Sequence, residues 1–281
     1  MTITVLDAGL LTTVQDRGRH GYAHLGVPRA GALDAAAAAL ANRLVGNRPD
    51  AALLETTMTG ASFRAGRAVT LAVTGADCGV RVDGRAAPFA EPVSVRAGAV
   101  VVAGPARRGV RSYLALSGGL AVPVVLGSRS TDTLAWVGPP AVRTGDVLPL
   151  GPVTGAAAPS DVTVVRVPVG PLRVRRGPRD DWVSARAWEV LTGSAYAVSP
   201  DSDRVGMRLA GPALERLDRG ELASEGIVLG AVQVPPSGLP LVFLHDHPVT
   251  GGYPVIGVVD PADLARCAQA RPGDEIRFAL R

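Results

Sequence analysis

The sequence predicts a mainly β protein, built from two β-units with a few short helices. Its 34 glycines and 23 prolines are scattered along 281 residues, which is typical of many short strands joined by tight turns. Hydrophobic residues make up 47% of the chain, enough to fill a substantial core. Two similar strings, VRTGDVLPL at 142–150 and ARPGDEIRFAL at 270–280, each join an arginine and a Gly-Asp turn to a closing strand. We interpret them as the ends of two related units.

All 29 basic residues are arginines, because the sequence contains no lysine. This excludes a phosphate-binding loop of the Walker type and Schiff-base chemistry, since both require a lysine. It also excludes covalent attachment of biotin to this chain. Any phosphate would have to be bound by arginine, backbone amides or a metal.

The remaining composition favours a cytoplasmic protein. The net charge is +4 and aromatic residues make up only 4%, so the scattered arginines form no nucleic-acid-binding pattern. Cys78 and Cys267 are far apart in the sequence, which favours a reducing compartment without disulfides. We find no export signal and no apolar run long enough to cross a membrane. We therefore expect neither nucleic acid nor a membrane as a partner.

A strand is expected at residues 2–6, and the polar string after it is the first candidate binding site. Gln15, Asp16, Arg17 and Arg19 place an amide, a carboxylate and two guanidinium groups within five residues. Such a cluster can clamp an anionic ligand. The alternative interpretation is a solvated loop with an internal Asp–Arg pair.

The string AAAAALANRLVG that follows Asp34 predicts a helix. Alanine and leucine are strong helix formers, and Asp34 is a favourable N-cap. Gly46 is expected to end the helix. We assign this segment to packing.

Between residues 53 and 150, β-branched runs separated by glycine-rich turns predict a series of strands. Glu55 and Asp77 are each either a buried acid facing a ligand or an ordinary hairpin acid. The loops at 117–119 and 127–131 are rich in small and hydroxyl residues. Loops of this kind can cradle phosphate oxygens, although most are ordinary turns.

GPVTGAAAPSD, residues 151–161, is the best candidate for a linker. It divides the chain into an N-terminal unit, 1–155, and a C-terminal unit, 156–281. The second unit opens with a strand from residue 162, and Asp180 is expected to cap a helix that ends near Gly193.

A last short helix is expected after Asp260, where proline occupies the first helical position. Its spacing places Leu264, Cys267 and Ala268 on the buried side. Cys267 is therefore expected to pack in the core.

The strongest functional signal lies in residues 224–259. Gln233 is a single amide in an apolar run, and a buried amide without partners costs about 1–3 kcal/mol, so we expect a defined hydrogen bond. The string Pro235-Pro236-Ser237-Gly238 predicts a fixed turn between two strands. The apolar LVFL then ends at His245-Asp246-His247, followed by the glycine pair at 251–252. Polar residues at a strand end, followed by glycines, are typical of a functional site.

The four histidines raise the alternatives of a metal site and a catalytic triad. On a strand, His245 and His247 would share one face with Asp246 on the other. A third ligand from His20 or His24 would require the two ends of the chain to meet. No Gly-x-Ser-x-Gly string supports a triad. We assign no metal-binding residues.

Three strings together resemble the KipA family, which includes the C subunit of 5-oxoprolinase and the second-subunit module of urea amidolyase and allophanate hydrolase. The first runs from Ser224 to Pro254 and includes QVPPSG and TGGYP. The second comprises TVQDRGR, GVP and GALD between Thr13 and Asp34, and the third is Arg-x-Gly-x-Arg-Leu at 204–209. Family members usually carry Arg-Gln-Thr after the aspartate, where this chain has HPV at 247–249. The resemblance implies two cyclophilin-like β-barrel units.

The resemblance implies three possible functions. As the C subunit of 5-oxoprolinase, the chain would act with a KipI-like partner (the B subunit) and a LamB/YcsF-like partner (the A subunit). The complex would open the lactam 5-oxoproline to L-glutamate with ATP, and any Mg²⁺ would be shared with one of the partners. As the carboxyltransferase module of a urea-carboxylase or allophanate-hydrolase system, the chain would need a separate biotin carrier. As a regulator, it would bind a KipI-like protein without catalysis. We favour the first function and expect the chain alone to be inactive.

The resemblance also suggests roles for individual residues. Asp246, Gln233 and Tyr253 are the predicted catalytic residues, facing the lactam or a metal. The predicted substrate- and nucleotide-binding residues are Gln15, Asp16, Arg17, Arg204, Ser237, Thr250, Gly251 and Gly252.

Overall fold

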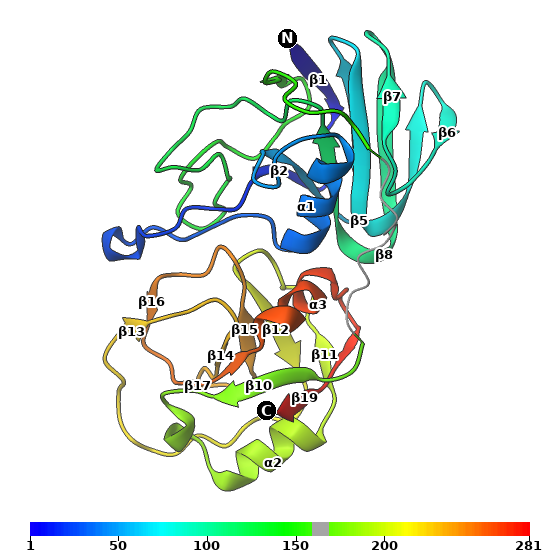
Figure 1. Cartoon of the computed structure of the whole chain (residues 1–281). Coiled ribbons are helices and arrows are strands. Elements are labelled where there is room, and N and C mark those ends of the chain that lie inside the picture. Colours follow the sequence, from blue (N-terminus) through cyan, green and yellow to red (C-terminus); the bar gives the residue numbers. More distant parts are fainter. Residues whose placement is uncertain (159–168) are drawn as a thin grey trace. The chain divides into compact units, whose positions relative to one another are not determined.

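A computed structural model of the protein describes residues 1–158 and 169–281, which contain 19 β-strands and three α-helices. The predicted mainly β fold is confirmed. The chain forms two compact units (Figure 1). Unit 1 comprises Met1–His20, Ala30–Asp132 and 136–158, and unit 2 comprises Gly21–Arg29, Thr133–Ala135 and 169–281. The end of the predicted linker, 159–161, and most of the strand predicted from residue 162 lie outside the described residues.

Unit 1 is organised around a nine-stranded antiparallel sheet. Its main order is β2 (Leu11–Gln15), β3 (Leu53–Thr57), β8 (Val100–Leu116), β4 (Ala61–Ala65), β1 (Thr2–Asp7) and β9 (Val147–Pro149). The long β5 (Val69–Val82) lies beside β8 and also pairs with β6 (Arg85–Ala87) and β7 (Val93–Val95) (Figure 1). The predicted strand at 2–6 corresponds to β1.

The pairing of β5 with β8 is interrupted by register shifts between Gly75 and Val80. Such bulges bend a strand and increase its twist, so one long strand contributes to two parts of the sheet. The first half of β8 pairs with β4 and its second half with β3. Buried side chains from these strands, including Phe63, Val101 and Leu114, form the core of the unit.

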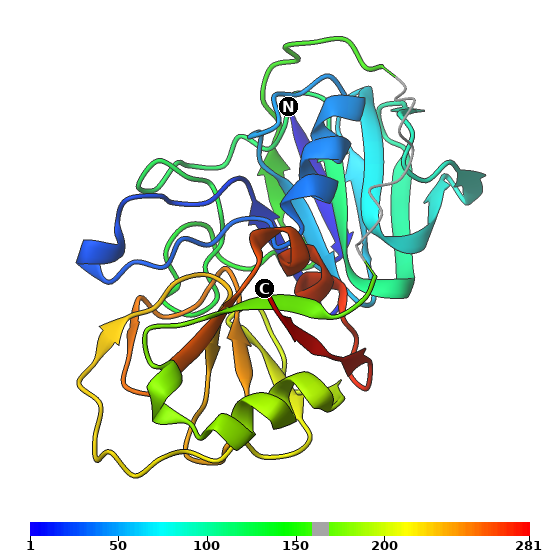
Figure 2. The ribbon, with the colours of Figure 1, turned by 60° about the horizontal axis from the view of Figure 1, so that its bottom comes forward.

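The helix α1 (Ala35–Leu44) covers one face of β5 and β8 (Figure 2). As predicted, Asp34 caps it, because the carboxylate accepts a hydrogen bond from the Ala37 amide at 3.0 Å. Gly46, two residues beyond the helix, adopts a left-handed conformation with φ of 75°. Leu40 and Leu44 pack in a cluster with Tyr113 of β8, so the assignment of α1 to packing is confirmed.

Unit 2 is built on an eight-stranded sheet. Its order is β18 (Glu275–Ile276), β11 (Tyr196–Val198), β12 (Gly206–Ala210), β15 (Leu241–Phe243), β14 (Ala231–Gln233), β17 (Val255–Val259), β10 (Leu172–Arg176) and β19 (Phe278–Leu280). Among the described strands of this sheet, only the β10–β19 pair is parallel. The short strands β13 (Glu225–Gly226) and β16 (Thr250–Gly251) form a separate ribbon. The predicted Pro-Pro-Ser-Gly turn joins β14 to β15, and the Gly238 amide donates to the Pro235 carbonyl at 2.9 Å.

The helix predicted to start at Asp180 begins later, so this capping prediction is wrong. Asp180–Trp182 forms a short 3₁₀ helix, and Val183 is extended with φ of −122° and ψ of 155°. The extended residue interrupts the helical path, and Ser184 caps α2 (Ala185–Gly193) by accepting from the Ala187 amide at 3.1 Å. The predicted end at Gly193 is confirmed.

The predicted helix after Asp260 is present in two parts. Asp260 accepts from the Ala262 amide at 3.0 Å and caps a 3₁₀ turn, Pro261–Asp263, which continues into α3 (Leu264–Gln269). Leu264, Cys267 and Ala268 are buried as expected. Burial raises the pKa of the Cys267 thiol to about 12, which agrees with a packing role because the thiolate is disfavoured.

The two repeated strings form the same turn in their respective units. The Asp146 carboxylate accepts from the Arg143 amide at 2.8 Å, and the Asp274 carboxylate accepts from the Arg271 amide at the same distance. The glycine before each aspartate has a positive φ, 94° in one turn and 89° in the other. The sequence repeat therefore reflects a repeat in local structure. No helix in the described part of the chain is long and apolar enough to span a membrane.

Candidate functional site

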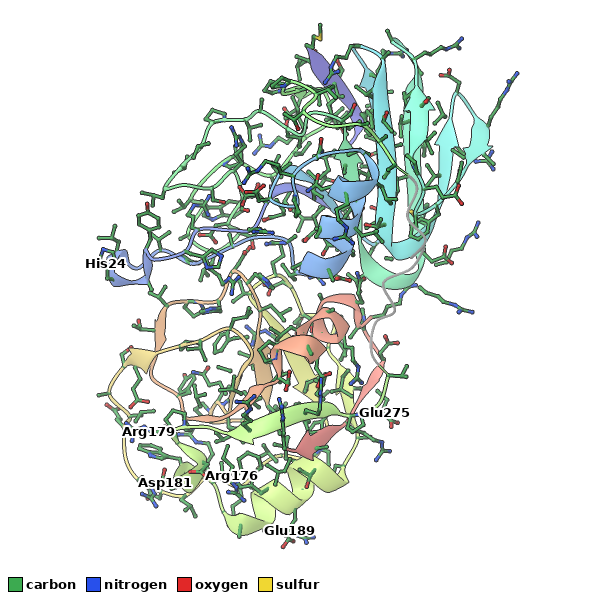
Figure 3. The ribbon with its side chains drawn as sticks, in the orientation of Figure 1. His24, Arg176, Arg179, Asp181, Glu189 and Glu275 are labelled. Atoms are coloured by element: carbon green, nitrogen blue, oxygen red, sulfur yellow. The ribbon has the colours of Figure 1, made fainter. Side chains whose placement is uncertain are left out.

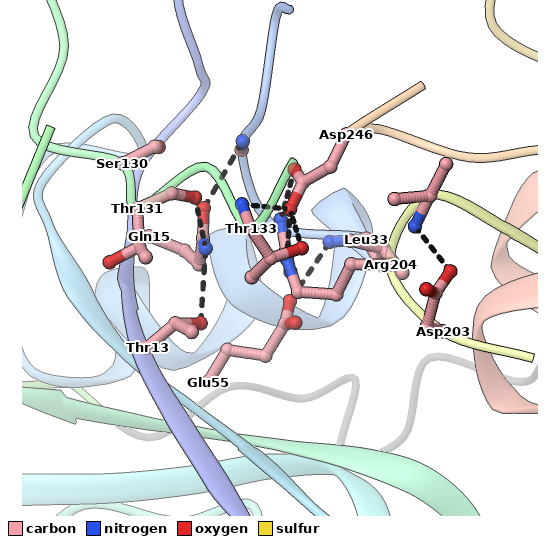
Figure 4. A network of polar contacts seen from close by, with 12 residues as sticks. Thr13, Gln15, Leu33, Glu55, Ser130, Thr131, Thr133, Asp203, Arg204 and Asp246 are labelled. Atoms are coloured by element: carbon pink, nitrogen blue, oxygen red, sulfur yellow. Dashed lines mark hydrogen bonds and ion pairs between the residues drawn. The ribbon is translucent and has the colours of Figure 1, made fainter. Parts of the chain in front are cut away.

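Asp246 is the centre of a buried polar cluster in unit 2 (Figure 4). It lies in the turn after β15 and is fully buried. Its Oδ2 accepts from Arg204 Nε at 2.9 Å, from the Thr133 amide at 2.9 Å and from Thr133 Oγ1 at 2.7 Å, and its Oδ1 accepts from Arg204 Nη2 at 3.0 Å. Arg204 is only 1% exposed. The two side chains therefore neutralise each other within the interior.

This geometry favours a positioning role for both charged groups. Paired hydrogen bonds between a guanidinium and a carboxylate fix orientation as well as charge, and a buried ion pair is tolerated only when it is well hydrogen-bonded. The predicted roles of Asp246 at the lactam and of Arg204 at phosphate stay predictions. In the described structure these two charged groups are hydrogen-bonded to each other.

Thr133 is a member of this cluster that sequence reasoning missed. It belongs to Thr133–Ala135, a segment grouped with unit 2 although the chain on both sides belongs to unit 1. The hydroxyl-rich string around it was a visible signal. Its partner Asp246 is 113 residues away in the sequence, however, and no local pattern connects them.

His247 is a buried histidine beside Asp246. Both His245 and His247 lie in or directly after a turn, where the Leu244 carbonyl accepts from the His247 amide at 3.1 Å, so the strand geometry considered for them is wrong. His247 Nδ1 lies 2.7 Å from the Pro248 carbonyl and must donate to it, since a carbonyl can only accept. The neutral ring then carries its lone pair on Nε2.

The surroundings of His247 favour its neutral form. Burial lowers the pKa of His247, the charge of Arg29 lowers it further, and the Pro248 carbonyl and Asp246 act in the opposite direction. A neutral imidazole with a free lone pair can accept a proton. The sequence raised this residue as a metal ligand or as part of a catalytic triad, and assigned it neither role. The described residues contain no group of three His, Cys, Asp or Glu side chains that could hold a metal.

Gln233, in the QVPPSG string, is hydrogen-bonded to the TGGYP string. It is 4% exposed, and its Nε2 donates to the Tyr253 carbonyl at 3.1 Å, so the expected hydrogen bond of the buried amide is confirmed. A Cβ atom at Gly251 would lie 2.6 Å from the Ile227 side chain and 3.2 Å from Gln233 Nε2. A side chain at position 251 would therefore require Ile227 and Gln233 to shift. The Tyr253 side chain is 46% exposed, and its backbone makes the contact.

The other predicted binding residues of unit 2 lie at the surface. Thr250 and Gly252 are exposed, and Thr250–Gly251 pairs with Glu225–Gly226 in the β13–β16 ribbon. Ser237 is exposed in the turn before β15, where its Oγ accepts from the Leu239 amide at 3.4 Å. These residues can contact a ligand or a partner without rearrangement of the core.

In unit 1, Gln15 is a fully buried connector at the end of β2. Its Nε2 donates to Thr13 Oγ1 and to the Thr131 carbonyl, both at 3.0 Å, and its Oε1 accepts from the Gly31 amide at 3.1 Å (Figure 4). These three hydrogen bonds use most of the donors and acceptors of the Gln15 side-chain amide. Gln15 therefore holds loop segments together.

The Asp16 carboxylate is hydrogen-bonded to the loop at 127–131. Its Oδ1 accepts from Ser128 Oγ and Ser130 Oγ, both at 2.6 Å, and its Oδ2 accepts from the Arg129 amide at 2.6 Å. Arg19 is buried and donates to the Val125 and Ser130 carbonyls. Of the predicted anion clamp, Arg17 alone has an exposed side chain.

Glu55 is a buried acid of unit 1, whereas Asp77 is exposed. Glu55 Oε2 accepts from the Leu33 amide at 3.0 Å, and Oε1 lies 3.7 Å from Arg111 Nε. Nearby, the Tyr113 hydroxyl accepts from the Asp34 amide at 2.7 Å. Burial raises the pKa of Tyr113 well above its ordinary value, and the charges of Glu55 and Asp34 add to this effect. The cluster anchors the start of α1.

Comparison with known proteins agrees with the resemblance seen in the three strings. The family described as carboxyltransferase domain, subdomain A and B, matches residues 25–280. The chain is 35% identical to the C subunit of 5-oxoprolinase of Escherichia coli over an alignment of 279 positions, which covers 98% of this chain and 90% of that relative. It is 32% identical to urea amidolyase of Saccharomyces cerevisiae over an alignment of 298 positions, which covers 96% of this chain and 16% of that relative.

A solved structure of Kluyveromyces lactis urea carboxylase has a similar fold. The TM-score is 0.90 at 29% identity, and the match covers 99% of this chain and 27% of the other. Sequence and fold therefore lead to the same assignment. The chain belongs to the carboxyltransferase domain family, subdomain A and B.

Proposed function

We propose that this chain is the C subunit of an ATP-dependent 5-oxoprolinase, which opens 5-oxoproline to L-glutamate in the cytoplasm. Its partners would be a KipI-like protein (the B subunit) and a LamB/YcsF-like protein (the A subunit). The observation that carries the proposal is the match to the C subunit of 5-oxoprolinase, which extends over 98% of this chain and 90% of that relative. By contrast, the chain corresponds to 16% of urea amidolyase.

The chemistry explains why such an enzyme needs several parts. Amide resonance stabilises the lactam, and water is a weak nucleophile towards it. ATP would supply a phosphoryl group to the lactam oxygen, which activates the carbonyl carbon towards water. The ring C–N bond would then break as the nitrogen takes up a proton, and hydrolysis of the resulting acyl phosphate would give L-glutamate and phosphate. The site must then orient the lactam, exclude bulk water and accept a proton from the attacking water.

In this proposal the residues of unit 2 divide these tasks. Asp246 positions Arg204 and Thr133, because its four hydrogen bonds connect them. Gln233 positions the backbone at Tyr253. His247 is the group that can accept a proton, since its Nδ1 already donates to a carbonyl and its pKa is lowered by burial.

The residues predicted to bind ATP do not by themselves fit a triphosphate. Arg204 is paired with Asp246, which leaves Arg17 as the exposed cation of the predicted set, beside the exposed but uncharged Ser237, Thr250 and Gly252. Phosphoryl-transfer sites usually surround the phosphates with several cations and backbone amides. We therefore propose that a partner protein supplies most of the nucleotide site, with any Mg²⁺, and that this chain contributes to the lactam site.

A carboxyltransferase module of the urea-carboxylase type is the second candidate. The family assignment and the TM-score of 0.90 to urea carboxylase favour it. Because the chain has no lysine, this function would require biotin on a separate carrier protein. A purely regulatory KipI-binding role would involve association without any contribution to turnover.

The test is reconstitution with alternative substrates. The purified chain is mixed with its KipI-like and LamB/YcsF-like partners, ATP and either 5-oxoproline or urea with bicarbonate, a biotin carboxylase and a biotinylated carrier. Release of L-glutamate from 5-oxoproline supports the proposal. Carboxylation of urea without glutamate release would support the second candidate, and unchanged turnover when the chain is omitted would support the regulatory role.

A further inference from the structure

Unit 1 contains a cavity of about 580 Å³ that is distinct from the predicted site. Its wall is formed by the start of β5, by β7, by the end of β8, by the C-cap of α1 and by the segment at 153–157. Cavities of about 300–1,000 Å³ are typical of small-molecule sites. The lining residues are Val45, Arg67, Ala68, Val69, Thr70, Ser94, Val95, Arg96, Ser117, Val153, Gly155, Ala156 and Ala157.

Arg67 is held in a fixed position at this cavity. Its Nη2 donates to the Ser117 carbonyl at 2.9 Å and to the Gly151 carbonyl at 3.1 Å. Gly118 has φ of 93°, and a Cβ atom there would lie 3.0 Å from Arg67 Nη2 and collide with the Gly151 carbonyl. Glycine at this position therefore allows the loop to close around the guanidinium. The loop at 117–119 serves to position a cation.

The charge of Arg67 has no counterion among the described residues. Arg67 forms none of the ion pairs found in residues 1–158 and 169–281, its buried Nε has no hydrogen-bond partner, and no carboxylate lines the cavity. Arg96 adds a second guanidinium at the rim, where it pairs with the partly exposed Asp83 at 2.9 Å. Arg67 is half-buried, so within the described residues its guanidinium has no negative charge beside it and can attract an anion from solvent.

A second cavity, beside α2 in unit 2, shows the opposite arrangement. Its charged residues form internal pairs or pair with adjacent arginines: Arg176 with Asp180 at 3.2 Å, Arg219 with Asp181 at 2.9 Å and Arg186 with Glu189 at 2.8 Å. Figure 3 shows Arg176, Asp181 and Glu189 along this part of the unit. That cavity is balanced in charge and does not select for an anion.

Hydroxyl groups complete the polar side of the Arg67 cavity. Ser117 Oγ accepts from the Thr70 amide at 3.0 Å, so its own proton remains available to an acceptor. The hydroxyls of Thr70 and Ser94 lie on the same wall. The C-terminal carbonyls of α1 would disfavour an anion, but the Leu44 carbonyl already accepts from the Ala158 amide at 3.2 Å. Valines and alanines form the remaining wall.

We propose that this cavity binds a small organic anion, a carboxylate or phosphate on a compact apolar body. Its oxygens pair with the Arg67 guanidinium and accept from the hydroxyls of Ser117 and Thr70, and its apolar part contacts the valines. This site does not depend on the proposed 5-oxoprolinase function, because binding is measured on the chain itself. Carboxylate and phosphate ligands share this chemistry, so separate probes distinguish them.

The test measures binding by titration calorimetry with 5-oxoproline, L-glutamate, glycerol 3-phosphate and inorganic phosphate, with glycerol as the neutral control. At least one anion should bind the wild-type chain at concentrations up to about 10 mM, and glycerol should not. In Arg67→Gln the dissociation constant should rise at least about tenfold. Arg85→Gln is the matched control, because Arg85 is an exposed arginine on β6 outside the cavity.

Thr70→Val keeps the test decisive if Arg67→Gln fails to fold. It removes one hydroxyl for which no hydrogen bond is found in the described structure and should weaken the same anion several-fold. The proposal is overturned if no anionic probe binds the wild-type chain. It is equally overturned if the anion binds Arg67→Gln or Thr70→Val as tightly as it binds Arg85→Gln.

Discussion

At the scale of single residues, the buried Arg204–Asp246 ion pair is expected to contribute to the stability of unit 2. We predict that Asp246→Asn lowers the free energy of unfolding by about 3–5 kcal/mol, because it removes the negative charge that is hydrogen-bonded to the buried Arg204 guanidinium. Asparagine keeps the shape of the side chain and can still accept from Thr133. Denaturant unfolding of the wild type and the variant measures the effect.

A double-mutant cycle separates the charge from the packing. Arg204→Met combined with Asp246→Asn removes both charges of the pair, so the double variant should lose less stability than the sum of the two single variants. Strict additivity, or a loss below about 1 kcal/mol in Asp246→Asn, would show that the pair is not an important source of stability.

His247 predicts a specific dependence of stability on pH. Its pKa in the folded chain is lowered from the ordinary value of 6.5 by burial, so the folded state binds this proton more weakly than the unfolded state. Its contribution is therefore present above the unfolded pKa and is lost as the pH falls through the folded pKa. The groups around it are Arg29, Asp246 and the Pro248 carbonyl.

The comparison is between the wild type and His247→Asn, in which the amide can still donate to the Pro248 carbonyl. Unfolding free energies are measured from about pH 7.5 to about pH 5. The wild type should lose more stability than the variant over this range. Parallel curves would mean that His247 does not change its protonation between the two states.

At the scale of elements, the start of α2 gives a direct comparison of two possible caps. Ser184→Ala should cost about 1 kcal/mol, since its Oγ accepts from the Ala187 amide. Asp180→Ala should cost less, because Asp180 only forms a partly exposed ion pair with Arg176. Thermal unfolding of both variants tests this order, and a larger loss in Asp180→Ala would restore the cap expected from the sequence.

Local signals in the sequence predicted elements well, whereas long-range contacts could not be inferred. The caps at Asp34 and Asp260 and the Pro-Pro-Ser-Gly turn depend on neighbouring residues, and all three are present. The position of Asp180 also matched a cap, but extended Val183 separates it from the helix. Contacts across more than 100 residues, such as Thr133 with Asp246, have no local signature.

The same distinction applies to the candidate site. Sequence strings selected Gln15, Asp16, Gln233 and Asp246 as residues with specific roles, and the structure shows each one in a defined hydrogen-bond network. The strings could not show where those bonds lead. Most of the hydrogen bonds of these four side chains are made within the chain. Fewer of the predicted residues are therefore available to bind a ligand.

At the scale of the whole molecule, the division into domains between residues 155 and 156 stays a proposal, and a fragment of the chain can test it. Unit 2 includes Gly21–Arg29 and Thr133–Ala135, and Thr133 provides two of the four hydrogen bonds to Asp246. A fragment comprising residues 156–281 lacks both segments. It should therefore unfold at a lower denaturant concentration than unit 2 does in the full chain. Equal midpoints would show that the inserted segments contribute little.

The central claim is that this chain is an essential part of a multi-subunit 5-oxoprolinase. The most direct measurement is L-glutamate release from 5-oxoproline and ATP in a complete mixture of the three proteins and in mixtures that each lack one of them. We predict glutamate release in the complete mixture and none from this chain alone or from the two partners without it. Turnover by the partners alone, or by the isolated chain, would contradict the account.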